Sequence, residues 1–196
     1  KELGRLDEAL ASYTEAIALK PDFAETHSNL GITLKELGRL DEALVSCTRA
    51  IALKPDFAEA HNNLGIILQE LGRLDEALAS YTQAIALKPY YAEALVNLSI
   101  DIQKMKFNTS NPKLYPPLTE LLTAESLRSP RDMAGSILNL LKQDAQIKDL
   151  LLKKNSAVSL REATSVIRSL NKLPLLHYLM RLCPLPELEF EELFVT

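Results

Sequence analysis

An eight-residue stretch, Leu-Gly-Arg-Leu-Asp-Glu-Ala-Leu, occurs three times in this chain of 196 residues. The copies are Leu3–Leu10, Leu37–Leu44 and Leu71–Leu78, and each begins 34 residues after the previous one. The surrounding sequence also repeats, because Ala24–Phe57 and Ala58–Tyr91 align without a gap and differ at only nine of 34 positions. A fixed period of this length is typical of a repeat array, in which each unit buries its apolar face against its neighbours. The sequence therefore predicts stacked units rather than one closed core.

Each unit contains two helical patterns. In the second full copy, Gly72 ends the first pattern, as turn residues often end a helix. Asp75 is a candidate N-cap for the second helix, and Pro89 stops that helix because proline cannot continue it. The residues at helical spacing in the first pattern are Leu64, Ile67, Leu68 and Leu71, and those in the second are Ala77, Leu78, Tyr81, Ala84, Ile85 and Leu87.

These features together resemble the tetratricopeptide repeat (TPR) family. The shared features are the period, the Leu-Gly pair of the first helix, small residues in the second helix and a closing proline. The residues concerned are Leu30-Gly31, Leu64-Gly65, Ala43, Ala50, Ala77, Ala84, Pro21, Pro55 and Pro89. The resemblance covers about 106 residues. It implies an all-α TPR α-solenoid, made of antiparallel helix pairs in a right-handed superhelix and followed by a small helical subdomain.

The resemblance also implies that first helices line a concave groove, which would bind an extended peptide or a partner helix. Amides recurring in this groove each offer two donors and one acceptor, so they could hold a peptide backbone. The Asn-Leu-Gly context is similar to the repeat array of O-GlcNAc transferase; the alternative is that each Asn only bonds a neighbouring helix. The candidate peptide-binding residues are Asn29, Asn63, Asn97, Ile32, Ile66, Ile100, Glu25, Glu59 and Glu93.

The isoleucines and glutamates in this set limit the ligand class. TPR arrays that clamp the carboxylate tails of heat-shock chaperones carry Asn where the isoleucines stand, and Lys in place of Ser28 and Asn62. This departure argues against such a ligand. The glutamates would either attract a basic ligand or merely stabilise the helix N-terminus.

Other classes of function find little support in the sequence. His27 and His61 recur singly without a neighbouring cysteine, so we expect a packed core role rather than metal binding, and no cofactor. Cys47 takes the place of a tyrosine and reads as a buried apolar residue. The net charge of −4 argues against nucleic acid, and no apolar run is long enough to cross a membrane. Two cysteines and no visible secretory signal predict a cytoplasmic protein.

We predict a TPR array at 1–106, a linker at 107–117 and a helical subdomain at 118–196 that is truncated. The array contains a partial repeat at 1–23, full repeats at 24–57 and 58–91, and a final helix at 92–105. Further helices should begin at Pro116 or Pro117, after Ser129, at Ser159, at Pro174 and at Pro186, and His177 should pack within one of them.

The sequence pattern of residues 121–151 and 173–195 resembles the helical connector of bacterial TPR proteins that carry a SAM-dependent methyltransferase domain. No Gly-rich nucleotide-binding loop is present, so any downstream catalytic domain would lie beyond Thr196. Both ends of the chain look cut. Our first hypothesis is a non-enzymatic protein-interaction module with a protein or peptide ligand. One alternative is the substrate-recruiting portion of a larger enzyme. We expect a methyltransferase in preference to an O-GlcNAc-transferase-like glycosyltransferase. The other alternative is a structural scaffold.

Overall fold

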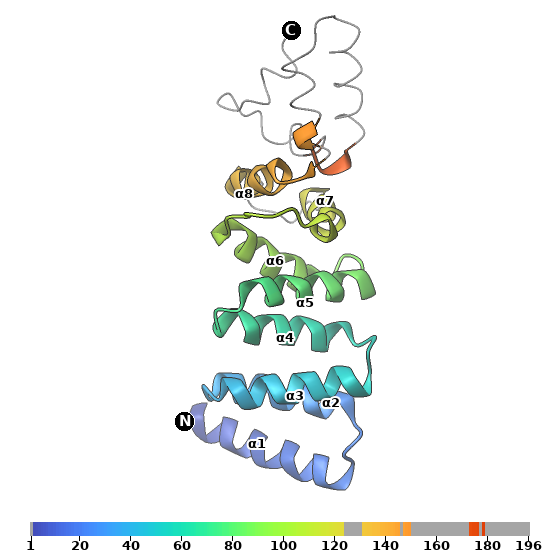
Figure 1. The fold of residues 1–196 in the computed structure, drawn as a ribbon. Helices are drawn as coiled ribbons and strands as arrows, with labels where there is room; N and C mark the ends of the chain where they lie inside the picture. The colour runs from blue at the N-terminus through green and yellow to red at the C-terminus, as the bar shows by residue number, and fades with distance from the viewer. Residues whose placement is uncertain (1, 124–130, 146, 150–172, 177, 179–196) are drawn as a thin grey trace, which may run out of the picture. The chain divides into compact units, whose positions relative to one another are not determined.

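The computed structural model describes residues 2–123, 131–145, 147–149, 173–176 and 178 (Figure 1). All regular structure within these ranges is helical, which confirms the all-α prediction. The chain divides into two compact units, Lys1–Asp101 and Ile102–Thr196.

Six helices follow one another through the first unit, and α6 runs just past its end. Consecutive helices from α1 to α5 pack against each other, and α2 also packs against α4 (Figure 1). This arrangement confirms the predicted helix pairs, α2 with α3 and α4 with α5. The helices are α1 (Glu2–Leu19), α2 (Ala24–Glu36), α3 (Leu40–Leu53), α4 (Ala58–Glu70), α5 (Leu74–Leu87) and α6 (Ala92–Lys104).

The glycine of the eight-residue motif shapes the turn between the two helices of a pair. Gly72 has a φ of +73°, and Gly38 has a φ of +75°. The Gly72 N–H donates to the Gln69 carbonyl at 3.0 Å, and the next N–H, that of Arg73, donates to the Leu68 carbonyl at 2.9 Å. This pair of bonds is a Schellman motif, which satisfies the last carbonyls of the helix. It needs a left-handed residue, and glycine adopts that conformation without a Cβ clash.

The predicted N-cap at Asp75 is wrong. Helix α5 begins at Leu74 with Arg73 at its N-cap position, and no side chain caps it. The Schellman turn uses Gly72 and Arg73, so the helix begins two residues earlier than expected. Asp75 lies in the first turn of α5, where its negative charge interacts favourably with the helix dipole.

Tight packing inside each pair depends on the other glycine of each unit. A Cβ built on Gly65 would lie 2.4 Å from Cε1 of Tyr81, and one on Gly31 would lie 2.3 Å from Sγ of Cys47. Tyr81 and Cys47 are both fully buried, which confirms the prediction for Cys47. Burial in this apolar contact raises the pKa of the Cys47 thiol to about 12.

In the second unit, a short 3-10 helix, η1 (Pro112–Leu114), follows the end of α6 and leads into α7 (Tyr115–Thr123), and α8 (Arg131–Lys142) comes next. Helix α7 begins at Tyr115, slightly before the predicted prolines, and residues 174–176 are helical as predicted. Helix α8 buries an apolar face that consists of Met133, Ile137, Leu138 and Leu141. The helices predicted to begin at Ser159 and Pro186, and His177, lie outside the described residues.

The Gly65–Tyr81 contact predicts a change of sign in a mutant cycle. Gly65→Ala alone should lower the free energy of unfolding by about 1–3 kcal/mol, because the new methyl meets the Tyr81 ring. In a Tyr81→Ala background the same change should be neutral or stabilising, since alanine favours a helix over glycine by about 1 kcal/mol. Urea denaturation of the four proteins measures both steps. Equal costs in the two backgrounds would show that the ring is not what excludes the side chain.

Candidate functional site

The nine predicted binding residues belong to α2, α4 and α6, the first helices of their repeats. We call the surface formed by Asn29, Ile32, Asn63, Ile66, Asn97 and Ile100 the first-helix face. Helix α2 packs beside α4, and a hydrogen bond joins α4 to α6. Asn29 and Ile100 are exposed, while Ile32, Asn63, Ile66 and Asn97 are partly buried.

The asparagines differ in what they contact. Asn63 donates from Nδ2 to Oγ of Ser28 at 3.0 Å. Asn97 donates from Nδ2 to Oδ1 of Asn62 at 3.1 Å. Both bonds link a first helix to the first helix of the previous repeat, as in the alternative interpretation of these residues. A side-chain amide has two N–H donors, so one such bond leaves the second donor for another acceptor.

The acceptors Ser28 and Asn62 were missed as site residues in the sequence analysis. Both are almost fully buried, at 1% and 2% exposure. Each immediately precedes a repeated asparagine, which places it on the side of the helix that meets the next repeat. The sequence signal that could have identified Ser28 and Asn62 is that a polar residue recurs directly before the repeated asparagine.

Two of the three predicted glutamates are paired with lysines of the chain. Lys54 donates from Nζ to Glu25 at 3.0 Å, and this bond lowers the pKa of the Glu25 carboxyl. Lys88 donates in the same way to Glu59 at 2.8 Å and lowers the pKa of that carboxyl. Glu25 and Glu59 therefore tie the first helix of a repeat to the end of its second helix, a role that neither sequence interpretation included.

The third glutamate has a different partner. The Tyr91 hydroxyl donates to Oε2 of Glu93 at 3.1 Å. Within the part of the chain that the structure describes, no lysine or arginine forms an ion pair with Glu93. Its side chain is exposed at the surface.

A pocket of about 430 Å³ opens on the first-helix face beside Glu93. It combines amide groups, one carboxylate and apolar side chains, and its volume is in the range of ligand-binding pockets. Val96 and Ile100 on α6 are 49% and 39% exposed, so this face also offers apolar surface outside the interior. The lining residues are Asn62, Ile66, Ala92, Glu93, Val96 and Asn97.

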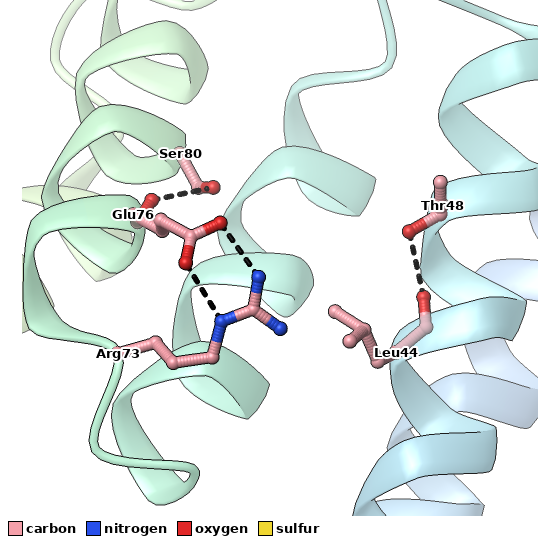
Figure 2. Close-up of polar contacts among 5 residues, drawn as sticks. All are labelled: Leu44, Thr48, Arg73, Glu76 and Ser80. Carbon is pink, nitrogen blue, oxygen red and sulfur yellow. Dashed lines mark hydrogen bonds and ion pairs between the residues drawn. The ribbon is translucent and has the colours of Figure 1, made fainter.

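The second helices present a different kind of surface. At the N-cap of α5, Arg73 donates two hydrogen bonds to the Glu76 carboxylate, each of 2.7 Å (Figure 2). The Ser80 hydroxyl donates to the Glu76 carbonyl at 3.0 Å. On α3, Thr48 donates to the Leu44 carbonyl at 2.8 Å (Figure 2). Here polar groups are satisfied within their own helix, and the Arg73 bond lowers the pKa of Glu76.

The repeated histidines are not core residues, which corrects the prediction of a packed core role. The His27 ring lies with Nε2 2.9 Å from the Pro21 carbonyl, and the His61 ring lies with Nε2 3.0 Å from the Pro55 carbonyl. A carbonyl only accepts, so Nε2 carries the proton and the ring ties the start of a first helix to the preceding proline turn. Both rings are half-buried.

Two properties of the described residues bear on other classes of function. No three of their His, Cys, Asp and Glu side chains lie close enough together to hold a metal ion. None of the helices in the described ranges is long and apolar enough to cross a membrane.

Comparison with known proteins agrees with this geometry. A family model described as TPR repeat matches residues 1–38, and one described as tetratricopeptide repeat matches residues 22–89. Residues 1–89 contain tetratricopeptide repeats. A comparison with curated proteins finds no match. The resemblance of the second region to a methyltransferase connector stays a prediction.

Solved TPR structures match the chain. The first TPR of Spaghetti (RPAP3), bound to the HSP90 peptide SRMEEVD, is 26% identical with a TM-score of 0.50, covering 53% of this chain and 82% of that one. The Arabidopsis OM64 TPR domain is 26% identical with a TM-score of 0.51, covering 53% of this chain and 86% of that one. MamA shares the fold at 21% identity, with a TM-score of 0.58, covering 80% of this chain and 94% of that one.

The inter-helix bond of Asn63 predicts a contrast between equivalent asparagines. Asn63→Ala should lower the free energy of unfolding by about 1 kcal/mol, because the bond to Ser28 is lost. Asn63→Asp should retain most of the stability, since the Ser28 hydroxyl can donate to a carboxylate. Asn29→Ala is the matched control, at an exposed position where little change is expected. Urea denaturation measures all three, and equal effects at positions 29 and 63 would contradict the structural role.

Proposed function

We propose that the TPR array, residues 1–106, is a protein-interaction module that binds an extended peptide on the first-helix face. The observation that carries this proposal is the pocket between α4 and α6, where amides and apolar side chains converge. Such a mixture suits a peptide, whose backbone needs hydrogen-bond partners and whose side chains bury apolar area.

Each part of the face has a separate task in this proposal. The second N–H of Asn63 and of Asn97 donates to peptide carbonyls, while the first keeps the helices in register. Ile66 and Val96 cover the apolar part of a peptide side chain. Burial of this kind contributes about 25 cal/mol for each Å² of apolar surface removed from water.

The contrast between the two surfaces supports this choice of face. On the second helices, the exposed Thr48, Arg73 and Glu76 side chains are bound to partners three or four residues away in the chain (Figure 2). The Spaghetti TPR, of similar fold, is bound to a peptide. That peptide is acidic, whereas Lys35 in the last turn of α2 lies 3.6 Å from Glu70 in an ion pair. We therefore propose peptide binding without the preference for an acidic tail.

Replacement of the three repeated asparagines tests this function. The variant Asn29→Ala, Asn63→Ala, Asn97→Ala should bind short peptides selected from a random library at least about tenfold more weakly. The reason is that up to three hydrogen bonds of about 0.5–1.5 kcal/mol each are lost. Fluorescence anisotropy measures the affinity, and circular dichroism checks that helical content is retained.

The control for this test is a change on the other surface. Thr48→Ala removes an exposed hydroxyl of α3 and should leave the affinity unchanged. Unchanged affinity in the triple variant, with its helices intact, would remove the asparagines from the binding site.

A second candidate function rests on sequence pattern alone. The sequence pattern of residues 121–151 and 173–195 favours the substrate-recruiting portion of a larger enzyme. A SAM-dependent methyltransferase is preferred over an O-GlcNAc-transferase-like glycosyltransferase. Reading the parent gene past Thr196 for a strand, a Gly-rich turn and a helix decides between the two candidates. We propose a reducing cytoplasm for either one, because Cys47 is a free, buried thiol.

A further inference from the structure

We infer that the pocket beside Glu93 selects a lysine side chain of the bound peptide. The inference rests on the proposed function and adds the chemistry of one ligand position. It is carried by a comparison of three equivalent glutamates within the chain, of which two already hold a lysine.

The two earlier repeats show what belongs at this position. Glu25 holds Lys54 at 3.0 Å, and Glu59 holds Lys88 at 2.8 Å. In both cases the ammonium also lies over an aromatic ring, 4.8 Å from the Phe57 centroid for Lys54 and 4.5 Å from the Tyr91 centroid for Lys88.

The third glutamate lacks this lysine. Lys54 and Lys88 are 34 residues apart, and the next position in this series, 34 residues after Lys88, is Leu122. The nearest repeated ammonium, that of Lys88, is bound to Glu59. Tyr91 supplies Glu93 with a neutral donor, which leaves the negative charge of the carboxylate uncompensated. A cation from a ligand would complete the pattern that the chain completes for itself in the two earlier repeats.

The pocket also fits the stem of a lysine. Ile66, Ala92 and Val96 provide apolar contacts for the four methylene groups, and Glu93 stands at the rim to meet the ammonium. Lysine commonly buries its stem along apolar surface while its charged end stays near water. Asn97 lies in the same pocket, where its second N–H can hold the carbonyl of the lysine residue.

Three peptide libraries test this inference on the full chain. Each has random residues around one fixed central residue, which is lysine, norleucine or glutamate. Norleucine has the apolar stem of lysine without the ammonium. The lysine library should bind about three- to tenfold more tightly than the norleucine library, as expected for a charge-assisted hydrogen bond at a partly exposed site. The glutamate library should bind most weakly.

The variant Glu93→Gln assigns the preference to one residue. Glutamine can still accept the bond from Tyr91 but has no charge, so lysine and norleucine should then bind alike. The matched control is Glu25→Gln, the same change where Lys54 already occupies the carboxylate, and it should keep the lysine preference. The preference should also shrink as salt rises, because exposed charges are screened over about 8 Å at physiological ionic strength.

The outcomes separate this inference from the function on which it rests. Equal binding of the lysine and norleucine libraries, or a lysine preference that survives Glu93→Gln, would overturn the lysine pocket. Peptide binding that still depends on the asparagines would leave the proposed function in place. Failure of all three libraries to bind would overturn both.

Discussion

The close approach of two helices at a glycine is the contact on which each repeat depends. Gly65 lies against the Tyr81 ring, and Gly31 lies against Cys47, at distances that leave no room for a Cβ atom. The Schellman turn at Gly72 then reverses the chain so that these surfaces meet. Once one pair is fixed, its outer faces have the shape that the next pair needs. A stable surface for binding follows from this repetition.

Polar contacts of the array join neighbouring repeats as well as the two helices of one repeat. The Asn63–Ser28 bond joins residues 35 positions apart in neighbouring repeats, and the Lys54–Glu25 bond joins residues 29 positions apart within one repeat. A group becomes available to a ligand where this repeated pattern stops. Glu93 is such a group, because its equivalents Glu25 and Glu59 both hold lysines. The end of a periodic sequence can create a binding site without any residue specific to it.

The periodicity of the sequence was sufficient to predict the helix pairs and the buried Cys47. The periodicity was less informative about helix starts and about which side chains are buried. Asp75 looked like a cap, but the Schellman turn had already fixed the helix start at Leu74. The His61 ring looked like a core residue, although it binds the Pro55 carbonyl at the surface. The role of Ser28 and Asn62 as acceptors is set by how the helices of adjacent repeats lie against each other. The spacing of residues along one helix carries no information about that placement.

The central claim is that the first-helix face, rather than the second-helix surface, contacts the peptide. Photo-crosslinking tests it most directly, with benzoylphenylalanine placed at Val96 on α6 or at Val45 on α3. Both side chains are exposed, at 49% and 70%, so neither substitution disturbs the interior. Our account predicts that the lysine library crosslinks at position 96 and not at position 45. Crosslinking at position 45, or equally at both positions, would contradict it.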